Sequence, residues 1–163
     1  MKKITYIIIA IIFLTFINAC AGYKPIYTTN LQFKIVDYSI KSNKKLGRQI
    51  YYKLYNLFKS NQNNAEAQSV TITIDTTKNK GVTVKDSTGK ILEYRIILNS
   101  GIIIKDYLTN DEVLNQNFSY SSMYKVQDLH SETIKLENKS IKDLINKTYQ
   151  DLLIKMSHII QTK

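Results

Sequence analysis

The chain has 163 residues, a mass of 18.9 kDa and 44% apolar residues, which is enough to bury one modest core, so we expect a single globular domain. Lysine and arginine number 23 against 13 acidic residues, a formal net charge of +10, while the apolar fraction and 12 tyrosines exclude disorder by composition. One cysteine and two histidines are too few for a cysteine–histidine zinc site or a disulfide framework.

Residues 1–19 have the anatomy of a secretory signal peptide. Two lysines follow Met1, and an apolar run without charge extends from Ile4 to Ile17. This run is marginally short for a membrane-spanning helix, and no basic flank follows it. We therefore predict an export signal that is removed from the mature protein.

The only cysteine, Cys20, ends this run. The tetrapeptide Ile17-Asn18-Ala19-Cys20 resembles the lipobox of bacterial lipoproteins. The resemblance implies cleavage before Cys20, a diacylglyceryl group on its sulfur and an acylated amino group, and several acyl chains anchor a protein stably. Ala21, in place of the aspartate that retains lipoproteins at the inner membrane of enteric-type bacteria, favours the outer membrane. The alternative is an ordinary hydrophobic cysteine with cleavage a few residues away.

Residues 20–30 contain Pro25 and show no hydrophobic period, so we expect a lipidated tether there and a single domain over residues 31–163. The first element of that domain is a strand, because apolar side chains alternate from Phe33 to Ile40. Ser42 or Asn43 then provides the N-cap of a helix.

Apolar residues recur at helical spacing from Leu46 to about Ser60, which predicts an amphipathic helix. Tyr51, Tyr52 and Tyr55 broaden its apolar face. We interpret them as the edge of a core, with a base-stacking platform as the alternative.

Three strands are expected next. Alternation begins at Val70, gives way to an irregular stretch over residues 76–80, and resumes at Val82. The turn Asp86-Ser87-Thr88-Gly89 predicts a hairpin, with Gly89 free to adopt a positive φ.

A long strand follows over Ile91–Lys105, with a bulge expected at Asn99-Ser100-Gly101. A turn at residues 108–111 leads to the last strand, Val113–Tyr124.

The C-terminal segment predicts a long amphipathic helix with Asn138 as its N-cap, while Gln127–Glu137 is a loop or an extra turn. Its inward positions are Ile141, Leu144, Ile145, Thr148, Leu152, Met156 and Ile159. The order β-α-β-β-β-α implies an α+β two-layer sandwich, in which two helices cover one face of a four-stranded, mostly antiparallel sheet. The other face, with Ile97, Ile103 and Tyr or Thr neighbours, would be exposed in a monomer and indicates a partner surface.

Recognisable catalytic motifs are absent from the sequence. There is no phosphate-binding glycine loop, no Cys-x-x-Cys, no His-Glu-x-x-His and no Gly-x-Ser-x-Gly. We therefore expect no enzyme, no metal site and no cofactor, and we interpret His130 and His158 as solvated residues. The basic charge fits a polyanion partner or, equally, a lysine-rich solvated surface. A nucleic-acid binder is the alternative from composition alone, and export argues against it.

Several short motifs, taken in order, resemble the LptE family of lipopolysaccharide-assembly lipoproteins of Gram-negative outer membranes. They are the lipobox with Cys20-Ala21-Gly22-Tyr23-Lys24-Pro25-Ile26-Tyr27, the turn Gly89-Lys90-Ile91-Leu92-Glu93-Tyr94, and Glu137-Asn138 before the last helix. The first tract looks most like alphaproteobacterial members, where Cys-Gly-aromatic-x-Pro-Leu-Tyr is usual. Here Ala21 is inserted and Ile26 replaces leucine.

The resemblance implies a non-catalytic lipoprotein on the periplasmic face of the outer membrane. It would plug and help assemble the LptD-like outer-membrane β-barrel and assist lipopolysaccharide transport and insertion into the outer leaflet. An auxiliary lipoprotein of a lipid-transporting ABC system is the alternative.

Within that family, a basic residue just before the matching glycine turn has been assigned to lipopolysaccharide contact. Here Ser87 falls near that position, and Lys85 and Lys90 flank it, with Lys80 and Lys78 on the preceding stretch. These four lysines are the predicted lipopolysaccharide-binding residues, and solubilising residues at an exposed turn are the alternative.

Overall fold

The computed structural model describes residues 32–161, with side chains as far as His158. Cys20, the predicted signal peptide and the predicted tether lie outside the described residues. The elements are β1 (Phe33–Ser42), α2 (Lys44–Phe58), the 3-10 turn η2 (Lys59–Asn61), β2 (Gln68–Lys85), β3 (Ile91–Asp106), β4 (Glu112–Lys125) and α3 (His130–Gln161). The predicted order of strands and helices is confirmed.

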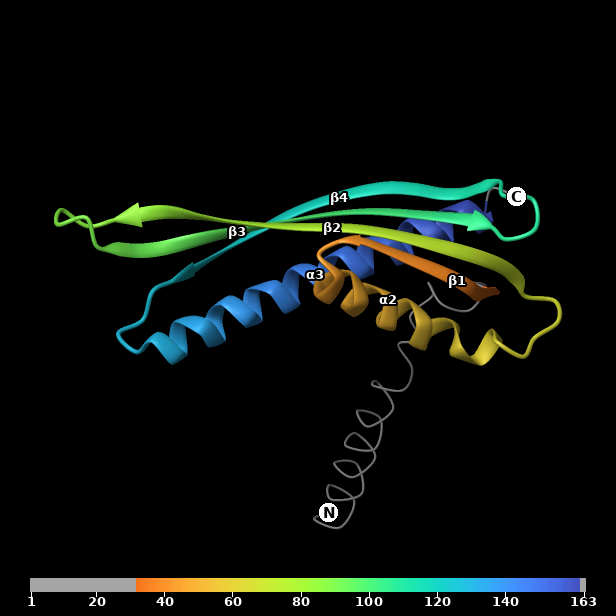
Figure 1. Ribbon diagram of the computed structural model, residues 1–163, viewed down its shortest axis with the longest axis horizontal. Helices are drawn as coiled ribbons and strands as arrows, with labels where there is room; N and C mark the ends of the chain where they lie inside the picture. Colours follow the sequence, from red (N-terminus) through yellow and green to blue (C-terminus); the bar gives the residue numbers. More distant parts are fainter. Residues whose placement is uncertain (1–31, 162–163) are drawn as a thin grey trace, which may run out of the picture.

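The four strands form one mixed sheet in the order β1-β2-β3-β4. β1 runs parallel to β2, whereas β2, β3 and β4 pair antiparallel. Figure 1 shows α2 and α3 on the same side of this sheet, and the β2–β3 hairpin extends to one end of the molecule. The predicted α+β sandwich with two helices on one face is therefore the observed architecture.

The core lies between the sheet and the two helices, because apolar side chains alternate along each strand with polar ones that face away. On the sheet side its fully buried residues are Ile72, Ile74, Ile96, Leu98, Ile102 and Ile104. On the helix side they are Ile50, Leu54, Phe58, Ile145, Leu152 and Met156. Neither described helix has a stretch long and apolar enough to cross a membrane.

The start of α2 is fixed by Asn43, one of the two residues predicted as its N-cap. Its Oδ1 accepts a hydrogen bond from the Leu46 N–H at 3.1 Å, and its own N–H donates to the Thr76 carbonyl of β2 at 3.0 Å. One turn later, a Cβ on Gly47 would lie 2.5 Å from Cγ2 of Ile40. The absence of a side chain at Gly47 therefore allows α2 to lie close against β1.

Two expectations about the long hairpin are wrong. Residues 76–80 are not irregular but continue β2, paired residue by residue with β3. The bulge expected at residues 99–101 is also absent, because pairing there is continuous on both sides. A Cβ on Gly101 would lie 3.0 Å from Oδ1 of Asn117, so this glycine leaves room for a neighbouring side chain rather than marking a bulge. Register shifts occur instead beside Val84 and Lys105.

The last helix begins at His130, so Asn138 is not its N-cap and Gln127–Glu137 is mostly helix rather than loop. The reason is that three inward positions in the first turns of α3, Thr133, Glu137 and Ser140, carry polar side chains. The Oγ1 atom of Thr133 accepts a hydrogen bond from the Gln127 N–H at 2.8 Å, which ties the helix to the chain before it. The hydrophobic period that marks the rest of α3 is therefore missing there.

Candidate ligand site at the hairpin end

The turn between β2 and β3 is organised by Asp86. Its Oδ1 accepts hydrogen bonds from the N–H groups of Thr88 and Lys90, both at 2.9 Å, and from the Thr88 hydroxyl at 2.7 Å. The Thr88 hydroxyl and these backbone N–H groups lower the pKa of Asp86. Gly89 has a φ of +87°, which confirms the predicted turn. The exposed Lys85 and Lys90 are thus held on either side of a defined turn.

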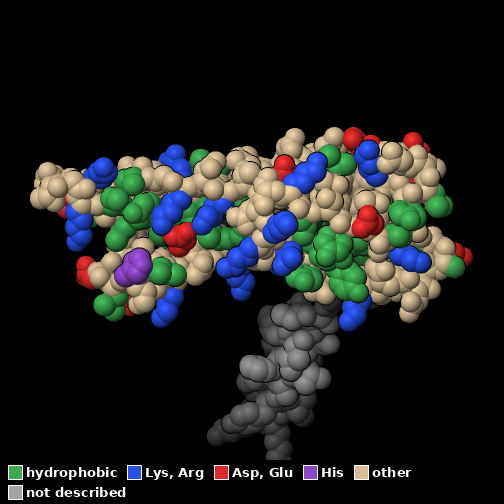
Figure 2. All heavy atoms as spheres, in the orientation of Figure 1, with side chains coloured by type: hydrophobic (Ala, Val, Ile, Leu, Met, Phe, Trp, Pro, Cys, Tyr) green, Lys and Arg blue, Asp and Glu red, His purple; other side chains and the backbone are tan. Residues whose placement is uncertain are grey.

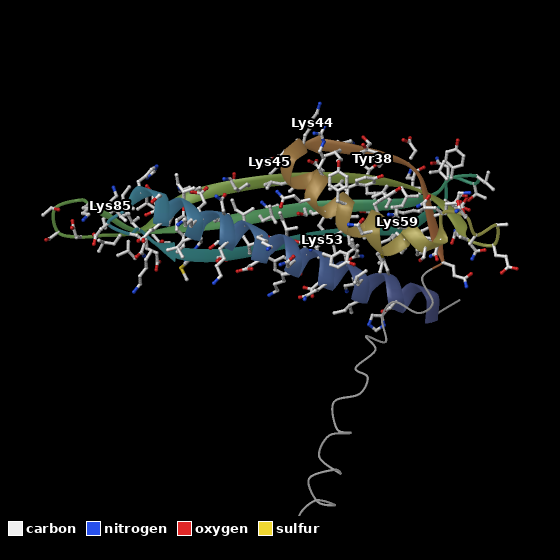
Figure 3. The ribbon with its side chains drawn as sticks, turned by 90° about the horizontal axis from the view of Figure 1, so that it is seen from below. Tyr38, Lys44, Lys45, Lys53, Lys59 and Lys85 are labelled. Carbon is white, nitrogen blue, oxygen red and sulfur yellow. The ribbon has the colours of Figure 1, made fainter. Side chains whose placement is uncertain are left out.

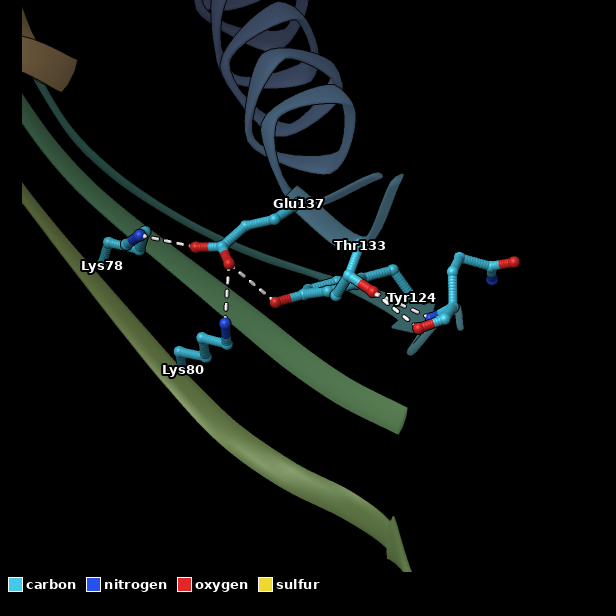
Figure 4. Close-up of polar contacts among 6 residues, drawn as sticks. Lys78, Lys80, Tyr124, Thr133 and Glu137 are labelled. Carbon is cyan, nitrogen blue, oxygen red and sulfur yellow. Dashed lines mark hydrogen bonds and ion pairs between the residues drawn. The ribbon is translucent and has the colours of Figure 1, made fainter. Parts of the chain in front are cut away.

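Lys78 and Lys80 belong to a different environment, a polar cluster between the hairpin and α3. Lys78 Nζ lies 3.1 Å from one carboxylate oxygen of Glu137, and Lys80 Nζ lies 2.7 Å from the other. The Tyr124 hydroxyl of β4 donates to the same carboxylate at 2.9 Å. Figure 4 shows these groups converging on Glu137. One carboxylate therefore links β2, β4 and α3.

The charged groups of this cluster shift one another's pKa values. Partial burial alone would raise the pKa of Glu137, but the hydrogen bonds from Lys80, Lys78 and Tyr124 outweigh it and lower the pKa to about 2. Partial burial likewise opposes the charge on Lys80, yet Glu137 raises its pKa above the usual value. The four predicted lysines are therefore two unlike pairs: Lys78 and Lys80 are ion-paired, whereas Lys85 and Lys90 face solvent.

A cleft of about 390 Å³ lies between the hairpin and the start of α3. Its lining includes Lys80, Lys90, Tyr94, His130, Ile134 and Glu137. Lys80 Nζ lies 4.2 Å from the centroid of the Tyr94 ring, so this ring faces a cation. Sequence reasoning found the lysines but did not place His130 and Ile134 beside them, because it did not extend α3 to this end.

Exposed apolar side chains accompany the cleft at this end of the fold. They are Val82, Val84, Leu92, Leu129 and Ile134, each with 41–61% of its surface exposed. Figure 2 shows green hydrophobic side chains beneath the projecting hairpin, next to blue basic ones. This combination of cations and apolar surface suits an amphiphile with anionic groups.

The open sheet face, on the side opposite the helices, is more polar than expected. Ile97 and Ile103 are half-buried among threonine, asparagine and serine side chains. A shallow hollow of about 440 Å³ lies on this face, and its lining includes Thr73, Asp75, Thr77, Asn99, Asn117 and Ser119. The Ser119 hydroxyl donates to Oδ1 of Asn99 at 2.7 Å, so these side chains also bond one another. Within residues 32–161, no group of three His, Cys, Asp or Glu side chains could hold a metal ion.

Comparison with solved structures finds a similar fold in three bacterial lipoproteins. No model of a protein family matches the chain, and no curated protein matches it. A lipoprotein from Caulobacter crescentus aligns with a TM-score of 0.57 at 11% identity, over 80% of this chain and 91% of that one. Lipoprotein B from Nitrosomonas europaea aligns with a TM-score of 0.57 at 16% identity, over 79% of this chain and 85% of that one. Rare lipoprotein B from Shewanella oneidensis aligns with a TM-score of 0.51 at 12% identity, over 77% of this chain and 96% of that one. The chain shares their fold.

Replacing Glu137 tests the polar cluster. Glu137→Gln should lower the free energy of unfolding by about 1 kcal/mol at neutral pH, because two ion pairs at the partly exposed cluster are lost. Since the folded pKa is depressed, the carboxylate contributes its stability above pH 4.5 and loses it as the pH falls toward 2. Urea unfolding should therefore show the wild type and Glu137→Gln converging as the pH falls over that interval. A constant difference between their stabilities would contradict this assignment.

Proposed function

We propose that this protein is an outer-membrane lipoprotein of the LptE type, held at the periplasmic face by lipid on Cys20. In this role it plugs and helps assemble an LptD-like β-barrel and assists lipopolysaccharide insertion, without catalysing a reaction. The lipobox-like sequence before Cys20 and the fold shared with three bacterial lipoproteins support the anchor and the class of protein.

The proposal that the partner is a barrel rests on the chemistry of the open sheet face. Its centre presents mostly uncharged hydrogen-bonding side chains, among them Asn99, Asn117 and Ser119, with one acidic and one basic residue, Asp75 and Lys41, beside them. The interior of an outer-membrane barrel is polar, whereas its outside is apolar. A sheet face of this kind therefore fits the inner wall of a barrel better than it fits lipid.

The hairpin end supports lipopolysaccharide as the ligand of the same assembly. Lipopolysaccharide carries anionic groups on acylated sugars, so it needs cations beside apolar surface. Lys85 and Lys90 supply exposed cations, and the neighbouring Leu92, Leu129 and Ile134 supply apolar surface. Lys78 and Lys80 act mainly through Glu137, which holds the hairpin against α3.

The anchor is tested by the mass of the protein extracted from membranes. The wild type should start at Cys20 and carry the mass of its acyl groups, because the predicted lipobox ends there. Cys20→Ala should remain an uncleaved precursor of lipoprotein signal peptidase. An unmodified Cys20 in the wild type would disprove the anchor.

The barrel partner is tested by purification from the native membrane in mild detergent. An outer-membrane barrel protein should co-purify, and Asn117→Arg should reduce its recovery several-fold, because a long cation is placed on the open sheet face. The matched change Asn138→Arg, at an exposed position of α3, should leave recovery unchanged. Recovery of no barrel, or of an ABC permease in its place, would overturn the assignment in favour of the alternative function.

The lipopolysaccharide site is tested by reversing two exposed charges. Lys85→Glu with Lys90→Glu should weaken lipopolysaccharide binding by the purified protein at low salt and leave thermal stability nearly unchanged, because neither lysine has an ion-pair partner among residues 32–161. Lys34→Glu with Lys155→Glu makes the same change in charge away from the hairpin end and should bind like the parent. Equal binding by the hairpin variant would remove this turn from the mechanism.

A further inference from the structure

A second basic region, unrelated to the hairpin, lies on α2 and the residues that flank it. Between residues 38 and 65 the sequence contains no aspartate or glutamate. The same segment contains six basic residues, Lys41, Lys44, Lys45, Arg48, Lys53 and Lys59. Both ion pairs found within residues 32–161 belong to Lys78 and Lys80, so none involves α2. Figure 3 shows the labelled lysines of α2 and of the following turn η2 far from Lys85 at the hairpin end.

The position of these charges is unfavourable for the helix itself. Lys44 and Lys45 occupy the first turn of α2, which contains no acidic residue, and Arg48 follows one turn later. The N-terminal end of a helix carries a partial positive charge, so cations there destabilise it. A solubilising role would be served as well by lysines in the last turn, where they would be favourable. The observed arrangement instead concentrates positive potential at one exposed place.

Aromatic side chains lie among these cations. Lys44, Arg48 and Tyr52 follow one another at four-residue spacing and so share the exposed side of α2. Tyr52 is 57% exposed, and the nearby Tyr38 is 47% exposed while its ring stacks on Tyr51 with centroids 4.0 Å apart. Tyrosine is enriched where proteins meet the headgroup region of a membrane. Cations interleaved with exposed tyrosines match that environment.

The tether brings this surface within reach of a membrane. Only 12 residues, 21–32, separate Cys20 from Phe33, so their span is at most roughly 45 Å. The chain enters the described fold at Phe33, whose ring meets that of Phe58 near the end of α2, with centroids 5.8 Å apart. A lipid on Cys20 would therefore hold α2 near the leaflet in which that lipid is inserted.

We propose that the α2 face, defined by Lys44, Lys45, Arg48, Tyr52, Asn56 and Lys59, binds anionic phospholipid headgroups of the leaflet that holds the anchor. The inference rests on the proposed function only for the lipid on Cys20. Because both helices lie on one side of the sheet (Figure 1), contact through α2 would leave the side chains of the open sheet face uncovered. Contacts of this kind are individually weak, additive and sensitive to salt.

The test uses the lipidated protein inserted into vesicles of phosphatidylcholine, with or without phosphatidylglycerol. A membrane-impermeant amine reagent labels exposed lysines, and mass spectrometry reads each site. Labelling of Lys44, Lys45 and Lys59 should fall several-fold when phosphatidylglycerol is present at low salt, and should recover at high salt. Lys135 and Lys139, exposed on α3, are internal controls whose labelling should not change.

Variants distinguish an effect of the α2 face from an effect of the total positive charge. Lys44→Gln, Lys45→Gln and Arg48→Gln together should abolish the protection of Lys59. Lys135→Gln, Lys139→Gln and Lys155→Gln remove the same charge from exposed positions of α3 and should preserve that protection. Equal labelling with and without phosphatidylglycerol, or unchanged protection in the α2 variant, would overturn the proposal.

The unlipidated Cys20→Ala chain provides a measurement that does not depend on the anchor. It should sediment with phosphatidylglycerol vesicles and not with phosphatidylcholine vesicles, and the α2 variant should lose this binding. Failure here while a barrel still co-purifies would reject the α2 face alone. If the Cys20→Ala chain binds these vesicles but Cys20 of the wild type proves unmodified, the anchor is rejected and the α2 face is retained.

Discussion

The contact between α3 and the inner face of the sheet is the constraint on which the other features depend. α3 has 32 residues, so it runs about 48 Å beneath β3 and β4. From Leu144 onward it packs there through buried apolar side chains such as Leu152 and Met156, whereas Glu137 ties its first turns to the sheet. Because α3 covers only one face of the sheet, the same contact leaves the other face open and forms one wall of the hairpin-end cleft.

α3 is held to the sheet by polar contacts in some places and by apolar packing in others, for a physical reason. Toward the hairpin end the sheet offers Lys78, Lys80 and Tyr124 to the helix in place of isoleucines, so a carboxylate satisfies them where an apolar side chain could not. Further along, the Tyr120 hydroxyl hydrogen-bonds to Asp151, and burial together with this carboxylate raises the pKa of Tyr120 to about 12. Polar contacts thus fix the position of α3 along β4, and apolar packing supplies most of its stability.

The sequence predicts the parts of this fold in which burial and apolar patterning coincide. The alternation in β2 and β3, the helical spacing in α2 and the Asn43 cap all follow from local rules, so the element order and the covered face could be inferred. The full length of β2 does not follow from the pattern, because Thr76, Lys78 and Lys80 face inward although they are polar. The start of α3 is hidden for the same reason, since polar residues such as Thr133 and Glu137 occupy inward positions there.

The candidate site shows the same limit. The lysines beside Gly89 could be found in the sequence, because a turn motif identifies its own neighbours. The ion pairs that Lys78 and Lys80 form with Glu137 could not be found in this way, since Glu137 is 57 residues from Lys80 along the chain. Nor could the sequence indicate that Tyr94 and His130 would line one cleft with Lys90. Contacts between distant residues depend on the register of β2 with β3 and on the true start of α3, and neither follows from local patterning.

The distribution of charge separates the surface into regions of different chemistry. The hairpin end joins cations to exposed apolar side chains, the α2 face joins cations to tyrosine, and the centre of the open sheet face carries little charge. A basic composition that served only solubility would not require this division. In salt, exposed charges act on a partner only within about 10 Å, so the face that carries them decides what they can bind. Since the three regions share none of the residues that define them, an amphiphile, a leaflet and a protein partner could be engaged by one domain without competing for the same side chains.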